Sequence, residues 1–214
     1  MDNAQEKKQA HLAEIYETHH RRGGRCEFTF GGEEKGRRFA AWVGADRRVL
    51  DLGCRDGTLT RFYAAGNEVI GVDIDRAALA QCKRELGIQT RWADVTTGLP
   101  FEDESFDVVV ASELLEHVGW PEVVVREVAR VLRPGGIFVG SVPNAFRLKN
   151  RLLFLLGIEY EHDPTHLRRF SWRGLSDLLR QYLTDVHIVP AFGRMAWLHG
   201  RLFANTLLWR AHKP

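Results

Sequence analysis

Between Arg48 and Asn144, short apolar runs rich in Val, Ile and Phe alternate with segments of helical periodicity. The runs are RRVLDLG, NEVIGVDID, QTRWADV, FDVVVAS and GGIFVGSVPN, and RAALAQCKREL and PEVVVREVARVL lie between some of them. Strands that are apolar on both faces and alternate with helices form a parallel sheet covered on each side. With DVHIVPAF and NTLLWRAHK as the last strands, the sequence predicts an α/β fold: a doubly wound, seven-stranded, mostly parallel sheet with helices on both faces.

The residues before this region have a different character. Leu12, Ile15 and Tyr16 fall at helical spacing among charged residues, the glycines of HHRRGGR interrupt the pattern, and EEKGRRFAAWV carries a second helical face. We therefore expect an N-terminal helical extension or lid over residues 1–45. Residues 46–214 are expected to form the main part of a single domain.

The charge balance and the cysteines exclude several classes of protein. A formal net charge of +2 over 214 residues is too small for an obligate nucleic-acid binder. The longest apolar run, LLFLLG, is far shorter than the ~20 residues of a membrane helix, and the polar start MDNAQEKKQA shows no export signal. Three cysteines without paired spacing argue against a disulfide framework or a zinc site. We expect a soluble, cytoplasmic protein, and the sequence assigns no oligomeric state.

Four local patterns in the second half of the chain make further predictions. The basic and aromatic residues from Arg194 to Lys213 can stack on nucleic-acid bases, but they also fit a final amphipathic helix and a buried strand, which we favour. The apolar stretch Leu152–Leu156 can line a substrate pocket, but we expect a helix docked on the sheet. Pro134-Gly135-Gly136 is expected to separate a helix from a strand, and Ser171 to cap a helix.

Acidic residues and glycines stand where the first two predicted strands end. Asp51 ends the first strand, the turn G-C-R-D-G follows and opens a helix at about Thr58, and Asp73 lies twenty-two residues after Asp51. Ligands of open α/β sheets bind beyond the carboxyl ends of the strands, where an acid such as Asp73 can accept both hydroxyls of a ribose. The turn lacks G-x-G-x-x-G, and Asp51 and Asp56 oppose a pyrophosphate. The sequence therefore predicts a nucleoside site for a cationic, phosphate-free ligand.

Five motifs in this order resemble those of class I S-adenosylmethionine-dependent methyltransferases. They are D-x-G-x-x-x-G, GVDID, ADV, LPFEDESFDVVVASELLEHV and LRPGGIFVGSVPN, within residues 48–144. The resemblance implies a Rossmann-like fold, an enzyme, and S-adenosyl-L-methionine as the cofactor. A nicotinamide-dependent oxidoreductase is disfavoured by the missing second glycine of the turn.

The resemblance also places individual residues against the cofactor. The glycine turn would pass under its methionine part, Asp73 would bind the ribose, Ile74 would lie against the adenine, and Asp94 would accept the adenine amino group. Ser112, with its neighbour Glu113, would face the methionine end and the acceptor. The full set of expected cofactor contacts is Asp51, Gly53, Cys54, Arg55, Gly57, Asp73, Ile74, Asp94, Val95 and Ser112.

Arg55 stands where this family usually carries glycine. We therefore expect an ordinary backbone φ at this position. The side chain is expected to lie in solvent, and the alternative is a clamp on the carboxylate of the cofactor.

Methyl transfer to a hydroxyl needs a base, because the hydroxyl proton has a high pKa. The HDPTH loop offers His162 and His166, and we expect His166 to be the base, followed by His162 and then His117. A structural role for these histidines, or packing of the Glu116-His117 pair against the sheet, is the alternative. His162 and His166 are four residues apart, as metal ligands can be, but Pro164 disfavours a regular helical face, so no metal is expected.

The acceptor implied by the resemblance is a small molecule, such as a sugar, a lipid-linked intermediate or a natural product, methylated on a hydroxyl oxygen. The Asn-Pro-Pro-Tyr motif used on exocyclic amines of bases is replaced by Ala111-Ser112-Glu113-Leu114, so a nucleic-acid acceptor is not expected. C- or N-methylation is one alternative. Another is a non-catalytic scaffold or sensor that binds the cofactor.

Overall fold

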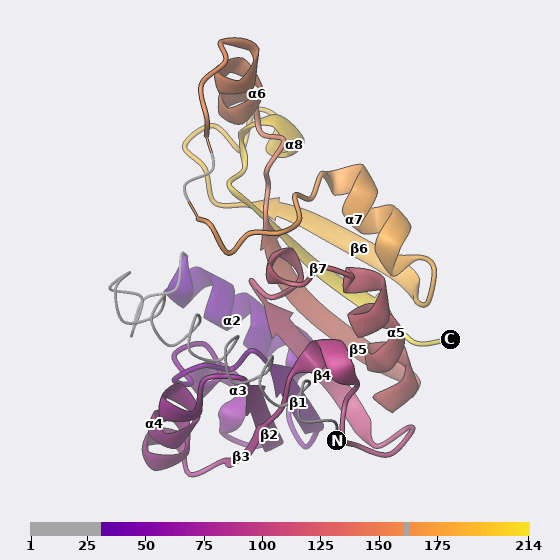
Figure 1. Cartoon of the computed structure of the whole chain (residues 1–214). Coiled ribbons are helices and arrows are strands. Elements are labelled where there is room, and N and C mark those ends of the chain that lie inside the picture. Colours follow the sequence, from indigo (N-terminus) through magenta and orange to yellow (C-terminus); the bar gives the residue numbers. More distant parts are fainter. Residues whose placement is uncertain (1–30, 161–162) are drawn as a thin grey trace.

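The computed structural model describes residues 31–160 and 163–214, and it shows one central sheet with helices on both faces (Figure 1). The strands are β1 (Arg48–Leu52), β2 (Glu68–Asp73), β3 (Gln89–Trp92), β4 (Phe106–Ser112), β5 (Leu132–Pro143), β6 (Thr184–Ala191) and β7 (Thr206–His212). Within the described residues they form a seven-stranded sheet of order β3-β2-β1-β4-β5-β7-β6. Only the pairs made by β7 are antiparallel. The predicted doubly wound, mostly parallel sheet is confirmed.

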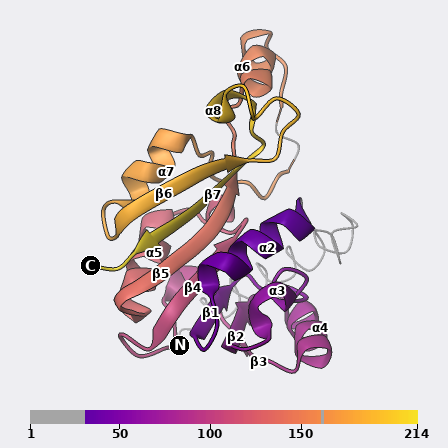
Figure 2. The ribbon, with the colours of Figure 1, turned by 180° about the vertical axis from the view of Figure 1, so that it is seen from behind.

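Helices cover both faces of this sheet. The helices of the described residues are α2 (Gly32–Val43), α3 (Arg61–Ala64), α4 (Arg76–Leu86), α5 (Pro121–Val131), α6 (Leu148–Leu155), α7 (Trp172–Leu179) and α8 (Gly200–Phe203), with the short 3₁₀ helices η1 (Val95–Thr97) and η2 (Leu115–His117). Figure 2 shows α2, α3 and α4 in front of the sheet, whereas α5 and α7 lie on the opposite face. The helix expected over EEKGRRFAAWV is α2, and the elements expected before it lie outside the described residues.

Successive residues of the central strands enter opposite cores. Leu50 and Leu52 of β1 join the core under α5 and α7, whereas Val49 joins the core under α2 and α3. In β4, Val109 and Val108 divide in the same way. Because side chains alternate between the two faces of a strand, a strand without polar positions is buried on both. This burial is why the apolar runs predict the sheet so well.

One turn prediction is confirmed and two are corrected. Ser171 caps α7 by accepting a hydrogen bond from the Gly174 amide at 3.0 Å. The helix after the glycine turn, α3, begins at Arg61 rather than Thr58. The Asp56 carboxylate accepts a hydrogen bond from the Thr58 amide at 3.1 Å and holds a turn there. Pro134-Gly135-Gly136 lies inside β5, which begins directly after α5, and the register with β4 shifts along this part of the strand.

The chain end and the helix α6 give contrasting results. The predicted final helix and buried strand are α8 and β7, and Trp209 of β7 is fully buried. The expectation that Leu152–Leu156 docks on the sheet is wrong, because α6 projects away from the sheet beside α8 (Figures 1 and 2). Adjacent apolar residues point all around a helix, so no single face can bury them. Phe154 and Leu155 are accordingly 74% and 79% exposed.

None of the helices among the described residues is long and apolar enough to cross a membrane. The division of the chain into residues 1–45 and 46–214 stays a prediction. Because Phe39 and Val43 of α2 pack in the same core as β1 and β4, the end of the expected extension is part of the sheet domain's packing.

Candidate functional site

The winding direction of the sheet reverses between β1 and β4, since β2 and β3 continue on one side and β5 on the other. Ligands of open α/β sheets bind beyond the carboxyl ends of strands at such a point. Gly53 follows β1, Asp73 ends β2 and Ser112 ends β4. The topology therefore brings residues singled out in the sequence to one edge of the sheet.

The glycines of the first turn are required by its backbone. Gly53 and Gly57 have φ of 73° and 84°, which glycine adopts without steric cost. A Cβ on Gly57 would lie 2.6 Å from the Leu86 side chain and 2.9 Å from Sγ of Cys82. The turn can therefore pack against α4 only with glycine at this position.

Arg55 has a positive φ of 49°, so the expectation of an ordinary backbone conformation is wrong. Its amide donates a hydrogen bond to Oδ2 of Asp73 at 2.9 Å, which helps to hold this left-handed conformation in a non-glycine residue. The guanidinium lies 3.8 Å from the Asp56 carboxylate, and the side chain is 25% exposed. Arg55 thus joins β2 to the turn through its backbone and pairs with Asp56 through its side chain.

Asp73 is held in a fixed orientation at the end of β2. Besides the Arg55 amide on Oδ2, its Oδ1 accepts the Asp75 amide at 2.8 Å. The residue is 6% exposed. Two backbone donors orient the carboxylate before any ligand arrives, which lowers the entropy cost of binding.

Asp51 is a buried acid at the end of β1. Its Oδ2 accepts hydrogen bonds from the hydroxyls of Thr60 at 2.6 Å and Tyr63 at 2.7 Å. Burial raises its pKa to about 6, with a smaller contribution from the charge of Asp73, and the two hydroxyl donors only partly offset this. A cationic ligand beside Asp51 would favour its charged form.

Lys35 reaches from α2 into the end of β4, a contact that the sequence did not predict. Its ammonium is fully buried and lies 2.8 Å from Oε1 of Glu113, which also accepts the Ser141 hydroxyl at 2.6 Å. The hydroxyls of Ser112 and Ser141 are 2.9 Å apart. Burial opposes ionisation of Glu113, but the charge of Lys35 and these hydrogen bonds outweigh it and lower the pKa. A charged carboxylate is therefore maintained at the carboxyl end of β4.

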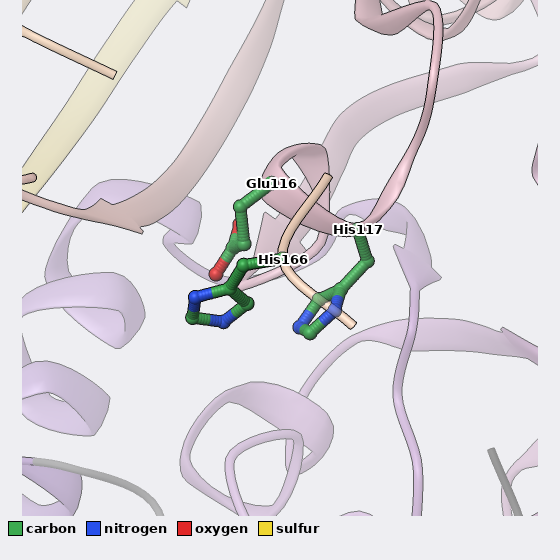
Figure 3. A group of neighbouring side chains, drawn as sticks. All are labelled: Glu116, His117 and His166. Carbon is green, nitrogen blue, oxygen red and sulfur yellow. The ribbon is translucent and has the colours of Figure 1, made fainter. Parts of the chain in front are cut away.

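Glu116 and His117 of η2 meet His166 of the loop between α6 and α7 (Figure 3). One potential ligand atom from each residue lies within 4.8 Å of the others, and the two imidazole rings are edge to face with centroids 4.8 Å apart. Both carboxylate oxygens of Glu116 are buried and accept no hydrogen bond from the residues described. Burial, and then the neighbouring charge of Glu113, raise the pKa of Glu116 well above its ordinary value.

The loop that carries His166 is fastened to η2 by its backbone. The carbonyl oxygen of Glu116 accepts the amides of Leu167 at 2.8 Å and Arg168 at 2.9 Å. Nδ1 of His117 lies 3.2 Å from the Thr165 carbonyl oxygen and 3.0 Å from its hydroxyl. The structure thus brings together two of the three histidines expected to act in catalysis, whereas His162 lies outside the described residues.

Comparison with known proteins agrees with this geometry. Residues 50–140 match the sequence model of a methyltransferase domain family. A ubiquinone biosynthesis O-methyltransferase of Burkholderia vietnamiensis is 34% identical over 174 residues, which are 75% of this chain and 73% of that protein. The chain belongs to the S-adenosylmethionine-dependent methyltransferases. The motif-based assignment to this family, and of S-adenosylmethionine as its cofactor, is confirmed.

Further relatives extend the comparison. A probable S-adenosylmethionine-dependent methyltransferase of Mycolicibacterium smegmatis is 36% identical over 137 residues, 63% of this chain, and the chain spans only about half (51%) of that protein's length. A structure from Thermotoga maritima, described as an S-adenosylmethionine-dependent methyltransferase and possible histamine N-methyltransferase, has a TM-score of 0.70 at 17% identity. It covers 95% of this chain and 98% of its own. This second likeness shows the methyltransferase fold alone.

The residues of this methyltransferase at the carboxyl ends of the strands suit the cofactor. Asp51 and Asp73 are buried acids beside a glycine turn, and S-adenosylmethionine carries a positive charge and two ribose hydroxyls. Asp94 is 8% exposed, and its Oδ1 accepts the amide and the hydroxyl of Thr96 at 2.9 and 2.7 Å. The Ile74 carbonyl accepts the Trp92 indole NH at 2.8 Å, which fixes the backbone after β2.

Two expected cofactor contacts can act only through their backbones. The Val95 side chain packs in the core under α5 and α7. The Cys54 thiol packs with Leu79 and Cys82, and the hydrogen bond with Cys82, followed by burial, raises its pKa well above the ordinary value. The thiol of Cys54 is therefore a neutral packing group.

Replacing Asp51 with asparagine is expected to stabilise the ligand-free methyltransferase at pH 8 by about 1–2 kcal/mol, and by nothing at pH 3.5. The folded pKa of about 6 lies above the ordinary 3.8, so the fold favours the protonated acid. The stability that the protonated Asp51 contributes is therefore lost as the pH rises through 6. Asparagine can accept the same two hydroxyls without the charge. Urea unfolding at both pH values measures the difference, with the exposed Asp177→Asn as control. An equal gain at both pH values would contradict the buried-charge explanation.

Proposed function

We propose that the chain transfers the methyl group of S-adenosylmethionine to a hydroxyl oxygen of a small-molecule acceptor. The observation that carries this proposal is the cluster of Glu116, His117 and His166 at the carboxyl end of β4. A hydroxyl acceptor must lose a proton of high pKa, whereas a neutral amine can attack without a base. Ionisable groups gathered at the carboxyl end of β4 are what an oxygen acceptor requires. The O-methyltransferase from Burkholderia vietnamiensis supports the same choice.

The cofactor supplies a methyl group bonded to a positively charged sulfur. The carbon–sulfur bond breaks as the oxygen–carbon bond forms, and a neutral thioether leaves. The hydroxyl proton passes to His166, or through the cluster to solvent. The protein contributes alignment and exclusion of water, because the sulfonium is already reactive. Of the three histidines, His166 is the base in this proposal, since it belongs to the cluster at the carboxyl end of β4 and has Asp163 3.7 Å from its Nε2.

We assign the cofactor contacts on the same basis. Asp73 binds the ribose hydroxyls, Ile74 and Asp94 lie at the adenine, and Asp51 with the glycine turn lies at the methionine part. Ser112 and Glu113 face the transferred methyl group. The observation that supports the set is the convergence of these residues beyond the carboxyl ends of β1, β2, β3 and β4.

Replacing Asp73 with alanine is expected to weaken binding of S-adenosylhomocysteine about 10- to 100-fold, the effect of a lost charged hydrogen bond. Asp73→Asn retains one acceptor and should give an intermediate loss. Calorimetric titration measures both, with Asp177→Ala as the matched surface control. Unchanged affinity in a folded Asp73→Ala protein would contradict the ribose assignment.

Acceptor chemistry is tested by transfer of radiolabel from S-adenosylmethionine to matched compounds that differ only in a hydroxyl, an amine or a methylene carbon. Sugars, phenols and alcohols that carry alkyl chains of several lengths represent the lipid-linked and natural-product classes. We expect label in the hydroxyl members. Label in the amines or carbons alone would establish N- or C-methylation instead, and tight S-adenosylhomocysteine binding without transfer to any of them would favour the scaffold or sensor.

A further inference from the structure

We propose that Glu116, His117 and His166 form a binding site for a divalent first-row metal ion such as Zn²⁺ or Mn²⁺. The sequence disfavours a metal for the pair His162 and His166. The structure instead combines His166 with a histidine and a carboxylate from η2 (Figure 3). Two imidazoles and one carboxylate are a common ligand set for such ions, whereas Mg²⁺ and Ca²⁺ prefer oxygen.

The distances are close to those that a metal ion requires. Metal–nitrogen and metal–oxygen bonds of about 2.0–2.2 Å place two ligand atoms about 3–4 Å apart. The three atoms lie within 4.8 Å of one another, so rotations of the side chains that move each atom by about 1 Å would complete the geometry.

Glu116 provides an independent reason to expect a cation. Its residue is only 2% exposed, and neither carboxylate oxygen accepts a hydrogen bond among the residues described. A buried carboxylate without hydrogen-bond donors is costly, and proteins usually pair such a group with a cation or a metal. The buried Lys35 does not serve this purpose, because its ammonium contacts Glu113 and Ser141.

The surroundings of the histidines are also typical of metal ligands. A metal-bound histidine usually donates its other ring N–H to a carbonyl or a carboxylate, which fixes the tautomer. Nδ1 of His117 faces the Thr165 carbonyl oxygen at 3.2 Å, and donation there places the lone pair on Nε2. The Thr165 hydroxyl donates to Asp163 at 2.6 Å, and Asp163 lies 3.7 Å from Nε2 of His166.

A metal ion at this place would bind the acceptor hydroxyl as a further ligand and lower its pKa. His166 would then act as a ligand, and the released proton would pass to solvent. This consequence rests on the proposed hydroxyl transfer, but metal binding itself does not, so the two can fail separately.

The test is titration of the chelator-treated full chain with Mn²⁺, followed by the electron paramagnetic resonance signal of unbound Mn²⁺. We expect one Mn²⁺ per chain, displaced by Zn²⁺, and a dissociation constant about 100-fold higher in Glu116→Gln and in His166→Ala. His187→Ala, an exposed histidine on β6, should bind as the wild type does. S-adenosylhomocysteine binding verifies that each variant is folded. Absence of binding in the folded wild type, or binding unchanged in both cluster variants, would overturn the proposal.

A second inference rests on a separate part of the molecule, the projecting end formed by α6, the turn after it, and the segment before α8 (Figure 1). We call this the α6 tip. Its exposed apolar side chains are Leu152, Phe154, Leu155, Leu156, Ile158, Met195, Trp197 and Leu198. Trp197 is 80% exposed and Leu156 is 72% exposed. Such a concentration of large apolar side chains in water marks an interaction surface.

The charges around the α6 tip indicate what it contacts. Residues 144–158 and 192–205 contain no Asp or Glu. Lys149, Arg151, Arg194 and Arg201 lie there and are exposed. Arg151 and Arg201 also line a hollow at the base of the tip, together with Arg173 and Trp172. A second copy of the chain would bring like charges together, whereas an anionic membrane surface complements them.

We infer that the α6 tip binds the surface of anionic lipid bilayers, with its apolar side chains inserted and its basic residues at the headgroups. Aromatic and aliphatic residues with Lys and Arg beside them are the composition of interfacial anchors. This inference is independent of the metal site, because the α6 tip contains none of the residues of η2 and does not include His166.

Co-sedimentation of the full chain with vesicles tests the surface. We expect binding to vesicles of phosphatidylcholine with phosphatidylglycerol, weaker binding to phosphatidylcholine alone, and loss of the difference at high salt. Phe154→Ser with Leu155→Ser should reduce the partition coefficient about 10-fold or more. Lys149→Ser with Arg151→Ser should reduce only the preference for anionic lipid. The inference would be overturned if neither double variant changed vesicle binding, or if a wild-type chain that still binds S-adenosylhomocysteine did not bind vesicles. It would also be overturned if the wild type formed a dimer that the same variants abolish.

Discussion

Replacing Lys35 with methionine is expected to lower the free energy of unfolding by about 2–4 kcal/mol at pH 7. Methionine fills much of the same volume, so the main change is that Glu113 loses its ion pair. The Glu113 side chain is 29% exposed, which lets water offset part of the cost. Chemical denaturation measures the loss.

The pH dependence of this difference has a definite sign. The pKa of Glu113 is lowered in the fold, because the charge of Lys35 outweighs burial. Stability from the pair is therefore present above the ordinary pKa of a glutamate, and is lost as the pH falls through the folded pKa. The difference in the free energy of unfolding between wild type and Lys35→Met should therefore become smaller in acid.

The matched variant is Lys35→Met with Glu113→Gln, which removes both charges and should recover most of the stability at pH 7. A double variant as unstable as Lys35→Met would show that the methylene stem of Lys35, and not its charge, stabilises α2.

The parts of the molecule that the sequence predicts well are those specified by local patterns. The apolar runs predict the strands, because burial on both faces leaves no polar position. The sequence predicts a turn with Gly53 and Gly57 directly after a strand, and both glycines have the positive φ angles that such a turn needs. The sequence does not predict the φ at Arg55, because the hydrogen bond that holds it is accepted by Asp73, eighteen residues away.

The contacts that the sequence does not predict join residues far apart in the chain. Lys35 and Glu113 are 78 residues apart, and a lysine is normally expected in solvent. One signal was available: Lys35 lies four residues before Phe39 and eight before Val43, on the helix face that packs in the core. The grouping of His117 with His166 likewise depends on backbone hydrogen bonds from Leu167 and Arg168 to Glu116.

The exposed α6 tip shows where an apolar run misleads. The hydrophobicity of the run LLFLLG favours burial. Its apolar residues are consecutive, however, so they do not form one face of a helix that could pack on the sheet. Its exposed position in the structure becomes reasonable when the partner is a lipid surface rather than the sheet.

Replacing His166 with alanine is expected to lower kcat for a hydroxyl acceptor about 10²- to 10⁴-fold, the range for loss of a group that handles a proton. The substitution would also lower kcat if His166 acts as a metal ligand. Affinity for S-adenosylhomocysteine should not change, because His166 is not among the residues assigned to cofactor binding. Initial rates with saturating cofactor, together with calorimetry, measure both quantities.

His187→Ala is the control, because His187 is an exposed histidine on β6, away from the carboxyl end of β4. His162→Ala, measured in parallel, tells which histidine of the HDPTH loop acts. Equal losses of turnover and cofactor affinity in His166→Ala would show that His166 holds the loop against η2 and takes no part in proton removal. Turnover unchanged in His166→Ala but lowered in His162→Ala would transfer the role of base to His162, and would separate it from the cluster with Glu116.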